Sequence, residues 1–337
     1  MQLAEEKMVS WIETLSGLRL GDRQAINVMR DLLRERVSKL AKKVWQRKRL
    51  TGDADQFGER FLSLAIMWLR TRHDLEESST RELLISRVLF FLAKQFLRPE
   101  RDDVPSPLQP TMPRHPRFEI ETLIKPLDEV SGDWCAGDVT QDGALWLLIA
   151  DVTGHGWPAH VLTSGLPHLW NLDVVRQWRE DGKNPASVLE YLSQELRSTP
   201  LPDGLFVDAT LARFDADGDV VIAAAGECRS LRHQPHEQRV EFQRFGSSYL
   251  GVDYSHDPPA ERRWPLRPAD EWLLSSDGLF DQPHHTGRLG ETLAKMKSLP
   301  QPHRSLCAAV AELLDRALAA RPQHDDITKV VVRLCSS

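Results

Sequence analysis

The sequence predicts an α+β protein in which a helical N-terminal module precedes antiparallel sheets covered by helices. Over residues 1–104 the apolar residues recur with helical spacing, which favours helices over strands. Beyond residue 118, apolar or alternating runs of strand length appear, and helical segments come in groups between them. Grouped strands and grouped helices are typical of antiparallel sheets rather than of alternating βαβ units.

Four helices are predicted in the N-terminal module. Apolar residues share one helical face over residues 8–18, and similar spacing continues over 26–44 and 57–69. Residues 78–80 (Ser-Ser-Thr) offer N-caps for a fourth helix that runs to Phe96. Helical modules with wide apolar stripes more often mediate dimerisation or partner binding than catalysis. We therefore expect residues 1–104 to form a regulatory module and a homodimer interface.

Residues 105–117 are expected to link this module to a second domain. Five prolines fall within residues 105–116, and a Pro-rich segment is stiff and extended. The second domain is therefore placed at residues 118–337.

Strands and helices alternate in blocks along the second domain. The predicted strands are Phe118–Lys125, Ala144–Asp151, Phe206–Phe214, Asp219–Ala225, Glu271–Ser276 and Ile327–Leu334. Asp142-Gly143 and Asp217-Gly218 predict hairpin turns. The predicted helices are Trp157–Trp178, Pro185–Arg197, Thr286–Lys297 and His303–Ala320.

Composition narrows the class of protein. The four cysteines lie far apart without CxxC spacing, which argues against a zinc ribbon or a disulfide framework and favours a reducing compartment. The N-terminus lacks a basic region followed by an apolar one, so no signal peptide is expected. No apolar run approaches the ~18 residues of a membrane span. We expect a soluble cytoplasmic protein that does not contact a membrane.

The net charge of −6 is unevenly distributed. Residues 1–102 carry 20 Lys and Arg against 15 Asp and Glu, and the basic run Lys39–Arg49 is the densest part. Such a run could bind nucleic acid. Its spacing also fits a solvated helix face with Leu40, Val44 and Trp45 turned inward, which we favour, so nucleic acid is not an expected partner.

Four acidic islands lie at the ends of apolar runs. They are Ser131-Gly132-Asp133, Asp151–Gly156, Ser276-Asp277-Gly278 and Asp325–Thr328. Each alone could be a turn, since Asp and Gly favour turns. An Asp at the mouth of a buried strand is costly unless its charge is compensated. Divalent Mg²⁺ or Mn²⁺ accepts oxygen-only ligands, so converging islands predict a metal site at a sheet edge.

Together and in this order, the islands resemble the metal-dependent serine/threonine protein phosphatases of the PPM type. The Asp-x-x-Gly-His-Gly-x-x-Ala form, at Asp151–Ala159, is similar to the SpoIIE/RsbU branch, and the resemblance runs from about residue 118 to 335. It implies a β-sandwich of two antiparallel sheets flanked by helices, with two Mn²⁺ or Mg²⁺ ions at one edge.

The resemblance also implies roles for the residues of the islands. Asp151 would bridge both metals and the Val152 carbonyl would add a ligand. Asp133 would hold the second metal, and Asp277 and Asp325 the first. Asp151 and Asp277 would thus be the central catalytic carboxylates. Two metals lower the pKa of a bridging water, and the resulting hydroxide would attack phosphorus without a phosphoenzyme.

Further candidates are less directly matched. Asp326 stands where many relatives carry Asn. Gly132 and Gly154 would allow close backbone approach around the metal. Eukaryotic relatives have a His as proposed general acid where this chain has Thr153, and the role does not transfer to the nearby His155.

The first island departs from the branch in a second way. Trp134 matches its usual aromatic residue, but Cys135-Ala136 provides no acid beside it, and Asp138 comes slightly late. The phosphate-clamping Arg of eukaryotic relatives also has no obvious counterpart.

Two classes of function stay open. The resemblance implies an enzyme that dephosphorylates phosphoserine or phosphothreonine in a bacterial signalling protein, with a phosphorylated STAS-domain anti-anti-sigma factor of a partner-switching pathway as the usual substrate. The alternative is a non-catalytic phosphoprotein-binding scaffold with a degenerate metal site. The retained Asp residues favour the enzyme, and the missing acid at 135–136 favours the scaffold.

Overall fold

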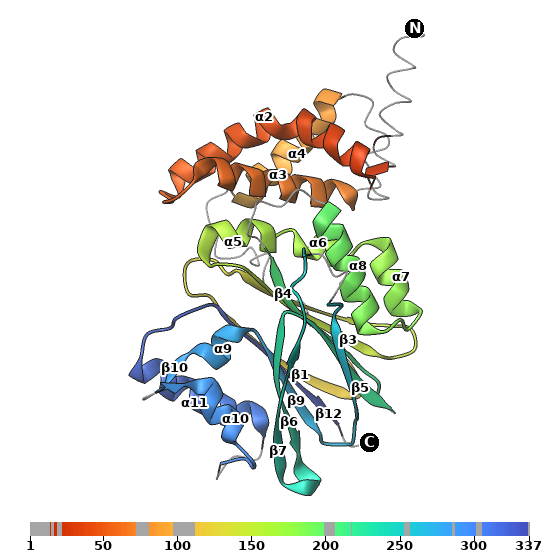
Figure 1. Cartoon of the computed structure of the whole chain (residues 1–337), viewed down its shortest axis with the longest axis vertical. Helices are drawn as coiled ribbons and strands as arrows, with labels where there is room; N and C mark the ends of the chain where they lie inside the picture. Colours follow the sequence, from red (N-terminus) through yellow and green to blue (C-terminus); the bar gives the residue numbers. More distant parts are fainter. Residues whose placement is uncertain are drawn as a thin grey trace.

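Figure 1 shows the computed structural model, with helices of the N-terminal module stacked on one end of a two-sheet domain. The structure describes residues 14, 17–18, 22–71, 81–96, 112–198, 206–216, 218–252, 257–284, 287–300 and 305–335. The predicted fold class is confirmed: helices come first, and two antiparallel sheets flanked by helices follow.

The N-terminal module contains α2 (Arg23–Arg47), α3 (Ala54–Arg70) and α4 (Arg81–Phe96). Asp22 caps α2 by accepting a hydrogen bond from the Ala25 N–H at 2.9 Å, which satisfies one of the free donors at a helix start. The three helices bury one common apolar core. The helix predicted over residues 8–18, except for residues 14, 17 and 18, and the caps at 78–80 lie outside the described residues.

In the described part of the second domain, the strands form two five-stranded antiparallel sheets. The first has the order β2 (Asp133–Val139), β3 (Leu145–Val152), β4 (Val207–Phe214), β5 (Asp219–Ala225), β8 (Ala260–Pro265). The second has the order β1 (Phe118–Lys125), β12 (Ile327–Leu334), β9 (Glu271–Ser275), β6 (Glu227–Gln234), β7 (Arg239–Gly246). A small ribbon pairs β10 (Pro283–His284) with β11 (Gly287–Arg288).

Four strands of the two large sheets, β2, β6, β7 and β8, and both strands of the small ribbon were not among the predicted ones. β7 and β8 are the outer strands of their sheets, and their outward side chains are largely charged. An edge strand needs only one covered side, and charged residues protect its open edge. The apolar run that identifies a central strand is therefore weak in them.

The two sheets pack face to face around one apolar layer. Leu147 and Ile149 of β3 meet Trp272 and Leu274 of β9 in that layer. Successive side chains of a strand point to opposite faces, so Leu148 and Ala150 point away from the second sheet, into a core shared with helices.

Helices cover both outer faces (Figure 1). On the first sheet lie α5 (Gly156–Thr163), α6 (Leu166–Trp170), α7 (Asp173–Glu180) and α8 (Pro185–Ser198). On the second lie α9 (Asp277–Asp281), α10 (Leu289–Lys295) and α11 (Leu306–Ala320). None of the helices in the described segments is long and apolar enough to cross a membrane.

The single helix predicted over Trp157–Trp178 is wrong, because the segment folds as α5, α6 and α7. Pro167 stands at the start of α6. A proline is tolerated in the first turn of a helix, but in the interior of one long helix it would remove a backbone hydrogen bond and break the helix. Gly165 precedes it in close contact with the module: a Cβ there would lie 2.2 Å from Met67 Cε. The break lets α3 approach the second domain.

The N-terminal module packs on α5, α6 and α8 through α3. The Arg60 guanidinium donates a hydrogen bond to the Pro158 carbonyl of α5 at 2.5 Å. Arg70 of α3 and Glu195 of α8 form a buried ion pair. This pair favours one position of α3 on α8, because separating the two charges would leave each buried and unpaired. Met67 packs into the core beneath α5–α8. Of the predicted linker, residues 112–116 have no regular secondary structure, and 105–111 lie outside the described residues.

Candidate metal centre at the edge of the sandwich

Three aspartates form a row across β2, β3 and β4. Asp133 is paired with Asp151 in the ladder between β2 and β3, and Asp151 is paired with Asp208 between β3 and β4. Directly opposite residues of antiparallel strands place their side chains on the same face. Asp151 lies on the same face of β3 as Leu147 and Ile149, which face the second sheet, so the row faces that sheet too.

The second sheet contributes two more carboxylates at the same edge. Asp277 is the first residue of α9, separated from the end of β9 by Ser276, and Asp325 lies just before β12. Asp277 lies close enough to Asp151 that its charge raises the pKa of Asp151. The charge of Asp325 also raises the pKa of Asp151, and the charge of Asp277 raises that of Asp325. The structure thus brings together the four aspartates that the sequence singled out, Asp133, Asp151, Asp277 and Asp325.

Asp208 is a fifth member of this cluster, and sequence analysis did not select it. It lies at the start of a predicted strand. The sequence pattern that could have identified it is a single Asp within an otherwise apolar strand. Only the register with β3 shows that it stands beside Asp151. Its Oδ2 accepts a hydrogen bond from the Glu227 N–H at 3.0 Å.

Desolvation and mutual repulsion make this cluster reluctant to ionise. Burial raises the pKa of Asp133 to about 7, and nearby Asp326 and Asp277 act in the same direction. Removal from water also raises the pKa of Asp208 to about 7, and that of Asp151 well above its ordinary value, with Asp133 as its strongest repulsive neighbour. Opposite charge nearby would reverse these shifts.

Two carboxylate oxygens of the cluster are buried without a hydrogen-bond partner in the described part of the chain: Asp133 Oδ1 and Asp277 Oδ1. Asp133 Oδ2, by contrast, accepts from the Ser276 hydroxyl at 2.7 Å. A buried acceptor without a partner carries an uncompensated desolvation cost, and a hard divalent cation would satisfy such oxygens.

Within the described segments, no three of these side chains already surround one common point at which a metal ion could bind. The oxygen-only donor set and the two unpartnered oxygens nevertheless fit a hard cation. Both features match the chemistry of Mg²⁺ or Mn²⁺.

Gly132 preserves space for backbone carbonyls at this edge. A Cβ on Gly132 would lie 2.9 Å from the Gly154 carbonyl oxygen and 3.2 Å from that of Val152. The Val152 N–H donates to the Gly132 carbonyl at 3.2 Å, which locks the two segments together. Gly154 itself has φ +88°, a conformation that favours glycine and turns the chain after Val152.

Asp326 serves the backbone in this structure. Its Oδ1 accepts from the Leu127 N–H at 2.7 Å and its Oδ2 from the Gly132 N–H at 2.6 Å. Asp326 thereby fixes the segment that leads into Asp133. Both of its oxygens are engaged, unlike those of Asp133 and Asp277.

His155 and Asp138 take positions outside the row of carboxylates. His155 Nδ1 lies 2.7 Å from Asp128 Oδ2, with both side chains about half exposed. The hydrogen bond to Asp128 raises the pKa of His155. Asp138, the late acid of the first island, pairs instead with Arg179 at 2.8 Å.

Comparison with known proteins identifies a family that covers more than half of the chain. The family described as "Stage II sporulation protein E (SpoIIE)" matches residues 141–334. No curated protein matches the chain.

Several solved structures have the same fold. The SiaA-PP2C domain of Pseudomonas aeruginosa is 23% identical with a TM-score of 0.51, over 64% of this chain and 85% of that one. The RsbU and RsbW domains of Rv1364c from Mycobacterium tuberculosis are 20% identical with a TM-score of 0.53, over 66% and 62%.

The PP2C phosphatase domain with a regulatory fragment of SpoIIE from Bacillus subtilis is 20% identical with a TM-score of 0.52, over 66% and 63%. This chain therefore spans a little under two thirds of the length of the last two structures.

Replacing Gly132 by Ala should weaken metal binding. The new methyl group would meet two backbone carbonyls, and backbone cannot move aside as a flexible side chain can. We expect Mn²⁺ affinity to fall at least about tenfold and stability to fall by roughly 1–3 kcal/mol, measured by calorimetric titration and urea unfolding. Gly218→Ala is the control, since its Cβ would be at an ordinary 3.4 Å from Asp215 Cβ. Unchanged Mn²⁺ affinity in Gly132→Ala would contradict this role.

The raised carboxylate pKa values should make metal-free stability depend on pH. Asp133 and Asp208 release their protons near pH 7 when folded, but near pH 3.9 when unfolded. Between these values the folded state binds more protons, so stability falls as pH rises. In EDTA we expect the unfolding free energy to drop between pH 4 and 8. Asp208→Asn should remove on the order of 4 kcal/mol of that drop, because each unit of pKa difference contributes about 1.4 kcal/mol. An unaltered slope would contradict the role given to Asp208.

Proposed function

The chain belongs to the SpoIIE family of PPM-type phosphatases, and from this premise we propose that it hydrolyses phosphoserine or phosphothreonine in a bacterial signalling protein. The observation that carries the proposal is the cluster of aspartates at one sheet edge, with Asp133 Oδ1 and Asp277 Oδ1 buried and unpartnered. A cluster that repels itself and lacks hydrogen-bond donors is suited to divalent cations.

In this proposal Asp151 would be the central ligand of two Mn²⁺ or Mg²⁺ ions. It stands between Asp133 and Asp208 in the sheet, close enough to Asp277 to be affected by its charge. Asp133 would hold one ion, Asp277 and Asp325 the other, and the Val152 carbonyl would complete the set. Two such ions activate water and neutralise charge on phosphoryl oxygens.

The protein residues around them orient the ligands. Ser276 donates to Asp133, and Asp326 fixes the Gly132 backbone. A cysteine nucleophile is not required by this chemistry, and the two buried cysteines are unsuited to the part. Burial raises the pKa of Cys228 to about 12, and it likewise raises that of Cys135, so neither forms a thiolate readily.

The substrate we propose is a phosphorylated STAS-domain anti-anti-sigma factor of a partner-switching pathway in the cytoplasm. Family membership supports this choice. The homodimer expected through the N-terminal helices is part of the same proposal.

We further propose that the N-terminal module regulates the metal centre through α3. Arg60 holds the Pro158 carbonyl, and Met67 packs beneath the helices that follow the site. Because α5 begins four residues after Val152, a displacement of α3 would reach Val152 and Asp151 through a short segment.

Phosphatase activity is tested with p-nitrophenyl phosphate. We expect Mn²⁺-dependent turnover that EDTA abolishes and that Asp277→Asn lowers at least about 100-fold, because the variant loses a metal ligand. Asp315→Asn, at an exposed position of α11, is the matched control and should retain activity. A folded wild-type protein that binds Mn²⁺ yet turns over neither this ester nor a phosphorylated STAS protein would favour the scaffold.

Regulation is tested by comparing the whole chain with a fragment of residues 118–337. If α3 sets the position of α5, the Mn²⁺-dependent turnover number of the fragment should differ several-fold from that of the whole chain. Circular dichroism would establish that the fragment is folded. Equal turnover and equal Mn²⁺ affinity would contradict coupling through α3.

A further inference from the structure

An open groove lies beside the candidate metal centre. It has a volume of about 270 Å³ and is bounded by β6, β7, α9, β11 and α10. Phe242 and Phe280 contribute apolar lining, and Arg229, Arg244 and Arg288 contribute charge. Its volume is below the ~300–1,000 Å³ that is usual for small-molecule pockets, so an extended chain with protruding side chains suits it better.

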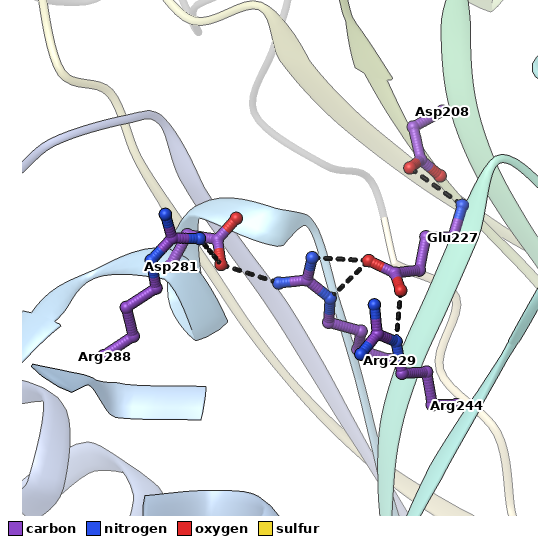
Figure 2. Close-up of polar contacts among 6 residues, drawn as sticks. All are labelled: Asp208, Glu227, Arg229, Arg244, Asp281 and Arg288. Carbon is purple, nitrogen blue, oxygen red and sulfur yellow. Dashed lines mark hydrogen bonds and ion pairs between the residues drawn. The ribbon is translucent and has the colours of Figure 1, made fainter. Parts of the chain in front are cut away.

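The arginines belong to a chain of alternating charges, which Figure 2 shows. Arg229 donates to Glu227 Oε2 at 2.7 Å and to Asp281 Oδ1 at 2.8 Å. Arg244 pairs with the other oxygen of Glu227. Arg288 pairs with Asp281 at 3.0 Å. This series of alternating charges therefore has an arginine at each end. In all, three guanidinium groups face two carboxylates.

The two terminal arginines have donors to spare. The side chains of Arg244 and Arg288 are 66% and 64% exposed. Among the described residues, each makes one ion pair, through a single nitrogen, although a guanidinium carries five N–H donors. Arg229, at 19% exposure, is held between its two carboxylates. The donors that are free to bind a ligand therefore lie on Arg244 and Arg288, at the two ends of the series of charges.

The same chain of charges reaches the metal centre from two sides. The Glu227 N–H donates to Asp208 at 3.0 Å, beside Asp151. Asp281 ends the short helix α9 that Asp277 begins. The charge of Arg229 acts on both Asp208 and Asp277. A phosphorylated residue at the metal centre would thus place its neighbours at the groove.

We propose that this groove binds the substrate polypeptide next to its phosphorylated residue, and that Arg244 and Arg288 select acidic side chains there. This inference rests on the proposed phosphatase function. Guanidinium groups match the planar geometry of carboxylates. Glu291 also lines the groove, so the total charge of the groove is balanced. The preference for acidic side chains therefore arises at the two exposed arginines rather than throughout the groove.

The test uses two phosphoserine peptides of equal length, one flanked by Glu and the other by Gln, with the whole chain in Mn²⁺. We expect kcat/KM to be roughly three- to tenfold higher for the Glu peptide, since each exposed ion pair contributes only a few-fold. The difference should shrink in high salt. In an Arg244→Glu/Arg288→Glu variant the preference should disappear, and a Lys-flanked peptide should become the better substrate.

Arg263→Glu is the matched control. Its side chain is 64% exposed and makes one ion pair, with Asp219 on the first sheet, away from the groove, so the preference for the Glu peptide should persist. If the Arg244→Glu/Arg288→Glu variant does not fold, Arg244→Gln/Arg288→Gln is used in its place. This neutral variant should abolish the preference for the Glu peptide without inverting it. A preference that survives both double variants overturns the proposal.

Binding of the same peptides, followed by fluorescence anisotropy, separates this inference from the proposed function. A wild-type protein that hydrolyses p-nitrophenyl phosphate but treats both peptides alike overturns the groove and leaves the phosphatase standing. A protein that binds the Glu peptide through Arg244 and Arg288 but hydrolyses no phosphoester supports the groove and overturns the phosphatase.

Discussion

Repulsion among the buried aspartates of one sheet edge is the constraint on which the rest of this structure depends. Asp133, Asp151 and Asp208 are forced together by strand register, and Asp277 approaches from the other sheet. Desolvated like charges oppose folding, so the sandwich must hold this edge by other means. The apolar layer around Trp272 and the backbone bonds of Asp326 supply that support.

The supporting contacts differ between the two sides of Asp151. Asp133 is fixed by Ser276, and the segment before it by Asp326. On the other side of Asp151, the chain turns at Gly154 and enters α5, where it meets α3 of the N-terminal module. A regulatory signal is more easily imposed on a helix held by Arg60 and side-chain packing than on a buried ladder.

The metal centre and the neighbouring groove share structural elements rather than merely lying near each other. Helix α9 carries Asp277 at its start and Asp281 at its end. Strand β6 begins with Glu227, whose backbone holds Asp208 and whose side chain holds Arg229. The position of the clustered carboxylates and the shape of the groove are therefore set by the same short segments.

The sequence alone determined the helical module, the antiparallel class and four of the five clustered aspartates, because apolar periodicity and Asp-Gly islands are local patterns. It did not determine the polar edge strands β7 and β8, whose pairing depends on neighbours. Nor did it identify Asp208, which joins the cluster only through register with Asp151. The sequence marked Asp326 as a further site candidate without a role, and only the fold shows that its carboxylate accepts from two backbone N–H groups. These features were decided by tertiary structure, because each depends on which distant segment supplies a charge, a donor or a covering strand.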